Sequence, residues 1–119
     1  MIYGYSEPQS IMIKDFVSEV VRSSFSFIST SNDLDIVSDV LKTEISNSYL
    51  ENNEKIMLFS QFENDEIVAI LKAIPKSSEM FKRPLFCGHT RHNDKWTLKY
   101  LLNHLIEERE EIKNARGRN

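Results

Sequence analysis

Apolar residues recur at helical spacing twice in the first half of the chain. The first stripe begins after Ser10, which suits an N-cap, and comprises Ile13, Phe16, Val17, Val20, Val21 and Phe25. The second follows the polar stretch at residues 29–33 and comprises Ile36, Val37, Val40, Leu41, Ile45 and Tyr49. Each stripe lies on one face of a helix with 3.6 residues per turn, so the pattern predicts two helices that pack on a core.

The middle of the chain contains two nearly continuous apolar runs, at residues 56–62 and 67–74. Residues 63–66 (Glu-Asn-Asp-Glu) join them, and an Asn-Asp pair tolerates the positive φ that a tight turn requires. We therefore expect an antiparallel hairpin covered on both faces, because neither run alternates with polar residues. Residues 85–87 predict a third main strand, and residues 1–9 predict a short strand or arm that Pro8 ends.

The C-terminal segment has the pattern of a polar loop followed by a long helix. Asn93 or Asp94 suits its N-cap, Gly117 suits its C-terminal end, and its apolar stripe comprises Leu98, Leu101, Leu102, Leu105 and Ile112. Together the elements predict one α/β (α+β) domain over residues 1–119, in the order helix, helix, hairpin, strand, helix. Its small mixed sheet is expected to be covered by helices.

Composition narrows the class of protein. At 119 residues with 40% hydrophobic residues, the chain can bury a core of its own. Its longest apolar runs fall far short of the roughly 20 residues of a membrane-spanning helix, and we expect no membrane partner. The single cysteine, Cys87, excludes an intramolecular disulfide and suits the cytoplasm. Richness in Asn, Ser, Ile and Lys is compatible with an AT-rich genome such as that of a bacteriophage, in which case the protein would be virion-associated.

The net charge of -3 is unevenly distributed. Residues 1–55 hold 4 basic and 9 acidic side chains, whereas residues 72–99 hold 7 basic and 2 acidic ones. A basic surface of this kind attracts phosphate, carboxylate or an acidic protein face. Because Phe81, Phe86 and Trp96 lie within it, a small nucleic-acid-binding protein is one alternative, although the overall acidity and the lack of a known nucleic-acid-binding motif argue against it.

Chemically active side chains are densest between the last predicted strand and the last helix: Cys87, His89, Arg91, His92 and Asp94. Ligands often bind at that position in α/β sheets. The spacing Cys87-x-His89-x-x-His92, with His104 as a fourth ligand, matches no common zinc motif. A Cys87 nucleophile paired with His89 or His92 would need a lowered thiol pKa, whereas a strand cysteine is more often simply buried. We therefore expect no metal site and no catalytic residue.

The order of predicted elements over residues 10–117 resembles the N-terminal two-thirds of the GNAT acyltransferase superfamily. In that family the strand equivalent to residues 85–87 lies beside acyl-CoA, and a loop of pattern Gln/Arg-x-x-Gly-x-Gly/Ala then wraps the pyrophosphate. Here Arg91 fits the first loop position, but Asp94 and Trp96 replace the two small residues. A carboxylate repels phosphate and an indole fills the space of the ligand, so the close backbone approach that glycine allows is lost.

The resemblance therefore implies a degenerate scaffold, without the later strands of the family, that serves as a non-catalytic protein-interaction or structural component. No cofactor is expected, and the partner is another protein or a second copy of the chain. The candidate partner-binding residues are Lys82, Arg83, Arg91, Trp96, Leu98 and Leu102. The alternative is an acyl-CoA-dependent N-acyltransferase in which Arg91, Asp94 and Lys95 would hold acetyl-CoA.

Overall fold

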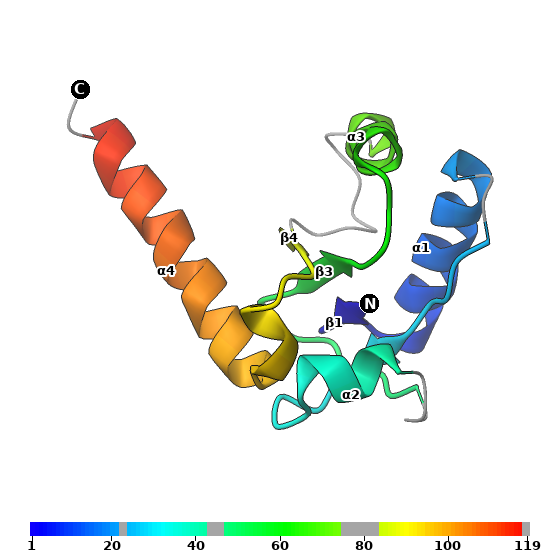
Figure 1. Cartoon of the computed structure of the whole chain (residues 1–119), viewed down its shortest axis with the longest axis horizontal. Coiled ribbons are helices and arrows are strands. Elements are labelled where there is room, and N and C mark those ends of the chain that lie inside the picture. Colours follow the sequence, from blue (N-terminus) through cyan, green and yellow to red (C-terminus); the bar gives the residue numbers. More distant parts are fainter. Residues whose placement is uncertain (22–23, 43–46, 75–83, 118–119) are drawn as a thin grey trace.

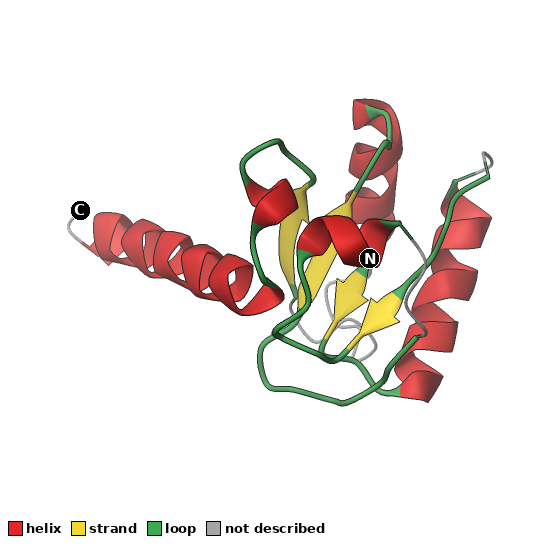
Figure 2. Ribbon diagram, turned by 60° about the horizontal axis from the view of Figure 1, so that its bottom comes forward, coloured by secondary structure: helices red, strands yellow, loops and turns green. Residues whose placement is uncertain are grey.

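The structure, a computed structural model of the 119-residue chain, describes residues 1–21, 24–42, 47–74 and 84–117. In this part of the chain, four α-helices accompany a four-stranded sheet of order β2-β1-β3-β4 (Figures 1 and 2). The strands are β1 (Ile2–Tyr3), β2 (Ser29–Thr30), β3 (Ile56–Phe59) and β4 (Leu85–Gly88). The α-helices are α1 (Glu7–Val20), α2 (Val37–Leu41), α3 (Asn64–Ala73) and α4 (Leu98–Gly117), and a short 3-10 helix, η1, covers Asn93–Lys95. The predicted α/β (α+β) fold class, with a small mixed sheet covered by helices, is confirmed.

The strands of the sheet pair in both directions. β1 runs parallel to β2 and antiparallel to β3. β3 and β4 are parallel, with Ile56 opposite Leu85 and Phe59 opposite Gly88. Parallel neighbours need a crossover connection, and α3 lies in the connection between these two strands. The carboxyl ends of β3 and β4 therefore lie side by side at one end of the sheet.

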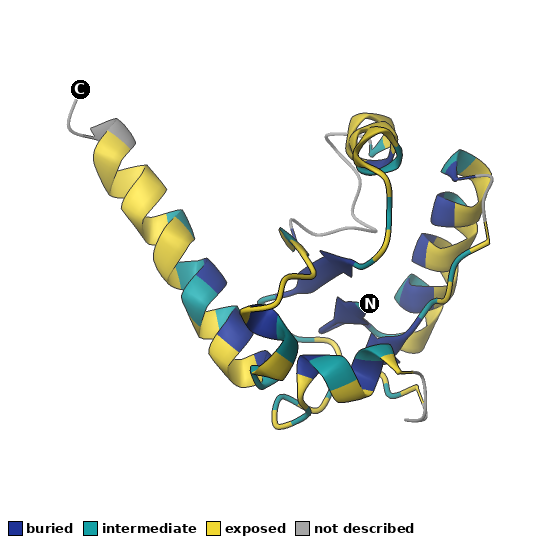
Figure 3. Cartoon of the chain, viewed as in Figure 1, coloured by how far each residue is buried: buried dark blue, intermediate teal, exposed yellow. Residues whose placement is uncertain are grey.

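Helices cover both faces of β3, whose four residues are all buried. Met57 and Phe59 belong to the core on which α1 and α3 pack, whereas Ile56 and Leu58 belong to the core on which α2 and the first half of α4 pack. This alternation is the two-residue period of a strand. Figure 3 shows the result, because the buried positions of the helices turn toward the strands and the exposed ones turn outward.

The expected hairpin is wrong, because residues 64–73 form α3 rather than a second strand. The segment expected as a turn is a capping box, in which the Glu66 carboxylate accepts a hydrogen bond from the Glu63 N–H at 3.0 Å and the Glu63 side chain accepts one from the Glu66 N–H. Its core-facing side consists of buried Ile70 and partly buried Ile67, continued by partly buried Ile74 just after the helix, while Val68 and Leu71 are exposed. Because apolar residues lie on both sides of this helix, its sequence resembles that of a strand covered on both faces.

Helix α1 begins earlier than its apolar stripe indicates. Ser6 is the N-cap: its Oγ accepts from the Gln9 N–H at 3.4 Å, and the Gln9 side-chain oxygen accepts from the Ser6 N–H at 2.9 Å. Pro8 lies in the first turn, where its missing N–H costs no hydrogen bond. Ser10, expected as the cap, is instead buried within the helix, and its hydroxyl lies 3.1 Å from Ser29 Oγ in β2.

The other two helices also differ from expectation at their ends. α2 has five residues; Ile45 of the predicted stripe lies outside the described residues, and Tyr49 is exposed in a non-helical segment. α4 begins after Thr97, whose hydroxyl accepts from the Tyr100 N–H at 3.2 Å, so neither Asn93 nor Asp94 is its cap. No helix in the described part of the chain combines the length and the apolarity that crossing a membrane requires.

Buried Lys55 joins the N-terminal segment to the loop that precedes β3. Its ammonium donates to Gly4 O at 2.8 Å and to Asn52 O. The neighbouring Glu54 carboxylate accepts two 2.9 Å hydrogen bonds from the Arg109 guanidinium of α4, and these bonds lower the pKa of the Glu54 carboxyl. One short loop therefore contacts both the first and the last element of the fold.

Replacing Gly4 tests this junction. Gly4 has a φ of +89°, and a Cβ at this position would lie 2.7 Å from Glu54 O. We expect Gly4→Ala to lower the free energy of unfolding by roughly 2–3 kcal/mol, measured by urea denaturation and circular dichroism. Gly88→Ala is the matched control, because a Cβ at that position would meet nothing within 4 Å, and it should change stability by less than about 0.5 kcal/mol. Equal effects of the two substitutions would contradict the proposed close approach.

Candidate functional site

A cleft opens at the carboxyl ends of β3 and β4. Its volume is about 790 Å³, which falls within the range of small-molecule sites. Its walls combine apolar side chains, among them Phe25, Ile28, Leu41 and Phe62, with polar ones, among them Ser60, His89, Asp94 and Lys95. In α/β sheets this is the position where ligands commonly bind, because loops from several strand ends converge there.

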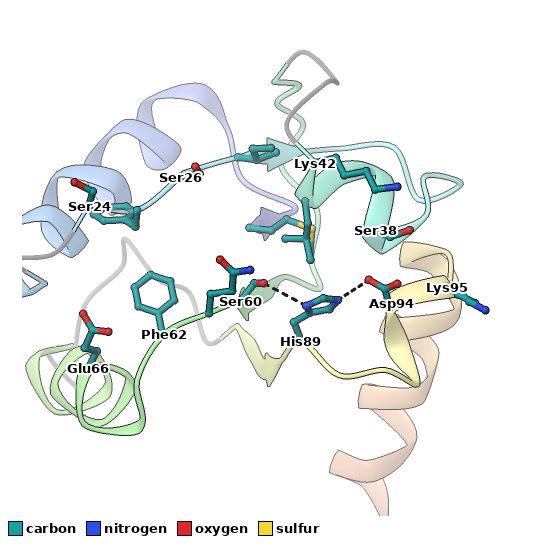
Figure 4. A pocket seen from close by; sticks show the side chains of 15 residues that line it. Ser24, Ser26, Ser38, Lys42, Ser60, Phe62, Glu66, His89, Asp94 and Lys95 are labelled. Atoms are coloured by element: carbon teal, nitrogen blue, oxygen red, sulfur yellow. Dashed lines mark hydrogen bonds and ion pairs between the residues drawn. The ribbon is translucent and has the colours of Figure 1, made fainter.

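Three of the lining side chains form a hydrogen-bonded line (Figure 4). Ser60 Oγ lies 3.2 Å from His89 Nδ1, and His89 Nε2 lies 2.6 Å from Asp94 Oδ1. Ser60 follows β3, His89 follows β4, and Asp94 belongs to η1, so three separate segments supply the line. The side chains of His89 and Asp94 are 29% and 35% exposed, which leaves the line accessible to a solute in the cleft.

The carboxylate of Asp94 determines which ring nitrogen of His89 carries the proton. An ionised carboxylate only accepts hydrogen bonds, so His89 Nε2 must be the donor. In the neutral ring Nδ1 then has the free lone pair, and the Ser60 hydroxyl donates to it. The Ser60 proton therefore points at a base whose protonated form would be stabilised by an adjacent negative charge.

Buried Asn93 holds the loop that carries His89 and Asp94. Its Oδ1 accepts from the Thr90 N–H at 2.8 Å, and its Nδ2 donates to Gly88 O at 2.9 Å. The His89 N–H donates to Phe59 O at 2.8 Å, which extends the β3–β4 ladder to the residue before Ser60. These backbone contacts thus fix the distance between the main-chain positions from which the Ser60 and His89 side chains extend.

The chain turns sharply just after Ser60. Gln61 has a φ of 62°, in the left-handed region that costs a residue with a Cβ about 1–2 kcal/mol. This turn places Ser60 between the end of β3 and the capping box of α3. Backbone strain of this kind is concentrated at functional sites, and Gln61 itself lines the cleft.

Cys87 does not belong to this line of polar groups. It is packed against the core between the sheet and the α2 and α4 helices, and burial raises the pKa of its thiol to about 12. A nucleophilic cysteine requires the opposite shift. Within residues 1–21, 24–42, 47–74 and 84–117, no three His, Cys, Asp or Glu side chains form a group that could hold a metal ion. His104, considered as a zinc ligand, lies 3.0 Å from the Glu108 carboxylate on its own helix.

The residues that the resemblance to acyltransferases singles out are only partly gathered at the cleft. Asp94 and Lys95 line it, whereas Arg91 is exposed in the preceding turn. Because Asp94 is already hydrogen-bonded to His89, it has a local partner that does not involve a phosphate group.

The sequence-predicted partner-binding residues are dispersed. Lys82 and Arg83 lie outside the described residues. Leu98 is fully buried in the core of the chain itself, and Leu102 packs partly buried against that core. Trp96 is half-buried, and its ring makes edge contacts with Tyr100 and His104 at centroid distances of 4.7 and 5.0 Å. Exposed Arg91 therefore forms no continuous exposed patch with Trp96, Leu98 and Leu102.

The sequence pattern does not single out Ser60, because Ser60 lies inside the predicted strand at residues 56–62 rather than at its end. Two signals identify it in retrospect. Glu63 and Glu66 have the spacing of a capping box, and Ile67, Ile70 and Ile74 have helical spacing. Together they predict a strand-helix-strand unit, which would bring the residues after its two strands to the same edge of the sheet.

The comparisons with known proteins concern the same half of the chain. A family model described as a domain of unknown function (DUF3783) matches residues 55–112. This range runs from Lys55 into α4 and includes Ser60, His89 and Asp94. No curated protein and no solved structure matches the chain. The match therefore covers all three residues of the hydrogen-bonded line without adding an activity.

The state of Cys87 can be tested by thiol labelling. The raised pKa, about 12 against an ordinary 9.0, leaves roughly a thousandfold less thiolate at pH 8 than an exposed cysteine has. We expect iodoacetamide to alkylate native Cys87 roughly a thousandfold more slowly than the same residue in urea, as followed by mass spectrometry. Alkylation at comparable rates in the two states would show that the thiol is not held in the core.

Proposed function

We propose that the cleft is the active site of an ester hydrolase in which Ser60 is the nucleophile and His89 is the general base. The observation that carries this proposal is the line from Ser60 through His89 to Asp94, at 3.2 and 2.6 Å, inside a cleft of about 790 Å³. A nucleophile, a base within hydrogen-bond reach and a third group that orients the base are the recurring parts of such sites.

In the proposed reaction, Ser60 Oγ attacks the carbonyl carbon of an ester while its proton moves to His89 Nδ1. Asp94 accepts from the Nε2–H throughout and stabilises the imidazolium. The bond from the carbonyl carbon to the alcohol oxygen then breaks, and that oxygen takes the proton from Nδ1. Water next attacks the acyl-Ser60 ester and gives a proton to Nδ1, which returns it to Ser60 Oγ as the acid leaves.

The ring of His89 is turned relative to the usual serine-protease arrangement, in which serine faces Nε2 and aspartate faces Nδ1. Here Ser60 faces Nδ1 and Asp94 faces Nε2. Both ring nitrogens can accept or donate a proton, so the roles are preserved with their positions exchanged. Proton transfer needs the hydrogen bond and the orientation of the ring, and both are provided.

The cleft lining favours esters of short apolar acids. Phe25 and Phe62 lie 6.1 Å apart between ring centroids, and they share the lining with Ile28 and Leu41. An apolar acyl group would be buried against these side chains, while the ester group would lie toward the polar line at Ser60. Substrate class is therefore proposed as uncharged short-chain acyl esters.

The proposals drawn from the sequence concern phosphate and acyl-CoA rather than an ester. A non-catalytic role followed from the missing phosphate glycines of residues 91–96, but ester hydrolysis does not use a phosphate cradle. The resemblance to GNAT acyltransferases relied on a hairpin, and that segment is a strand followed by a helix. An acetyl-CoA site at Arg91, Asp94 and Lys95 would also have to compete with the bond from Asp94 to His89.

Docking onto a protein partner is the second candidate function. It is favoured by the second half of α4, whose side chains from Glu110 to Ala115 are all exposed. Because this surface lies on a different part of the chain from Ser60, docking and hydrolysis do not exclude one another.

Labelling with a fluorophosphonate tests whether Ser60 is a nucleophile. We expect the probe to modify Ser60, identified by peptide mass spectrometry, and hydrolysis of p-nitrophenyl butyrate to depend on the same residue. Ser60→Ala and His89→Gln should each lower kcat/KM on the order of a hundredfold or more, and Asp94→Asn less, because it acts through the ring of His89.

Ser18→Ala is the matched control, because Ser18 is an exposed serine whose hydroxyl donates to Lys14 O within α1. It should leave labelling and hydrolysis unchanged. Labelling of a different residue, or labelling of Ser60 that His89→Gln does not slow, would refute the proposed activation. Circular dichroism of each variant separates loss of chemistry from loss of fold.

A further inference from the structure

Attack on an ester by Ser60 places negative charge on the carbonyl oxygen, and the line from Ser60 to Asp94 supplies no donor for that charge. His89 Nδ1 takes the serine proton, and His89 Nε2 is occupied by the Asp94 carboxylate at 2.6 Å. Donors aimed at the developing oxyanion usually make the largest single contribution to catalysis of acyl transfer. A hydrolase at this cleft therefore needs a further hydrogen-bond donor close to Ser60 Oγ.

The direction of the carbonyl oxygen follows from the other two substituents of the carbonyl carbon. In the proposed reaction the acyl chain lies against Phe25 and Phe62, and the alcohol oxygen must reach His89 Nδ1 to receive its proton. Figure 4 shows Ser60 between Phe62 on one side and His89 on the other. The carbonyl oxygen consequently points away from both, and its donor must come from another part of the cleft lining.

Outside the hydrogen-bonded line, six side chains with N–H or O–H groups line the cleft: Ser24, Ser26, Ser38, Lys42, Gln61 and Lys95. Figure 4 shows Ser24, Ser38 and Lys95 away from Ser60, toward the two ends of the cleft. Gln61 directly follows Ser60 in the chain, so the Cα atoms of the two residues are about 3.8 Å apart. Among these donors Gln61 is thus the one that covalent connection keeps beside the nucleophile.

The backbone at Gln61 brings its side chain into the same cleft as Ser60. Consecutive side chains of an extended strand point to opposite faces, which would separate residues 60 and 61. Gln61 instead has a φ of 62°, and both residues line the cleft. Glycine adopts this conformation without the steric cost of a Cβ. Glu63 and Glu66 make the capping box of α3, and the Gln61 side chain forms no hydrogen bond with another described residue, so neither contact accounts for a glutamine here.

We propose that the side-chain amide of Gln61 donates a hydrogen bond from Nε2 to the carbonyl oxygen of the ester and stabilises the oxyanion that forms as Ser60 attacks. The N–H bond of the amide stays intact. The π electrons of the carbonyl move to its oxygen on attack and return when the alcohol oxygen leaves, and the same sequence recurs when water attacks acyl-Ser60. This assignment rests on the proposed hydrolase activity and adds to it the group that binds the reacting oxygen.

Replacement of Gln61 by glycine tests the assignment, because catalysis should be lost while stability is kept. Gln61→Gly removes the amide together with the Cβ that disfavours the left-handed backbone, so the urea midpoint should stay the same or rise. For p-nitrophenyl butyrate, kcat should fall on the order of a hundredfold, with KM changed less than about threefold. A trifluoromethyl ketone, which binds a reactive serine as an oxyanion, should lose affinity by a similar factor.

Two further substitutions at Gln61 separate the hydrogen-bond donor from the rest of the side chain. Gln61→Glu should be as impaired as Gln61→Gly, because an ionised carboxylate only accepts hydrogen bonds. Gln61→Asn keeps an amide and suits the left-handed backbone, so it should retain more activity than either. Asn103→Ala is the matched control, since it removes an exposed amide on α4 that does not line the cleft. It should leave kcat unchanged.

Fluorophosphonate labelling of Ser60 separates failure of this assignment from failure of the hydrolase activity itself. A wild-type chain whose Ser60 is not labelled would refute both proposals. If Ser60 is labelled and the ester is hydrolysed, yet Gln61→Gly keeps the wild-type kcat, another group binds the oxyanion and the assignment is wrong. A Gln61→Gly variant that loses activity and urea midpoint together would show a structural role for Gln61 and would equally overturn the assignment.

Discussion

The parallel pairing of β3 with β4 is the contact on which the candidate site depends. Phe59 lies opposite Gly88, and the His89 N–H donates to Phe59 O, so the chain leaves both strands at the same level. In an antiparallel pair the two carboxyl ends would lie at opposite ends of the sheet. Ser60 and His89 can therefore meet only because the connection that contains α3 brings the chain back to the end of the sheet where β3 starts, so that β4 runs in the same direction.

The contact between Asp94 and His89 depends on the loop that follows β4. Considered along the sequence alone, a carboxylate in the loop before a helix suggests a cap or a residue that repels phosphate. In the structure Asn93 closes the loop through Thr90 and Gly88, and Asp94 is brought to His89 Nε2 at 2.6 Å. The charge that weakens an anion-binding interpretation is the charge that, in the proposed hydrolase, orients His89 as a base toward Ser60.

The type of element could be predicted from the sequence where apolar residues lie on one face only, and it could not where they lie on both. α1 and the first half of α4 have a buried stripe and a polar face, and both were predicted. α3 carries exposed Val68 and Leu71 beside buried Ile70, so its composition resembles a strand although its spacing is helical. Because residues 64–73 were expected to form a strand, the parallel pairing of β3 with β4 and the contact between Ser60 and His89 were not predicted. β1 and β2 are too short for any periodicity, and their pairing depends on long-range contacts.

The two halves of α4 make separate physical contributions. Its start is anchored to the segment before α2, since the Leu98 N–H donates to Asp35 O at 2.9 Å and the Lys99 N–H donates to Asp33 O at 2.8 Å. The Val37 N–H donates to Trp96 O at 2.9 Å, directly after η1, so these bonds also hold the segment that carries Asp94. Among the described residues, the last bond from this helix to the rest of the fold is the one from Arg109 to Glu54, near the middle of α4. Stability of the domain and position of Asp94 thus constrain the first half of the helix, whereas Ile112 in the second half remains exposed.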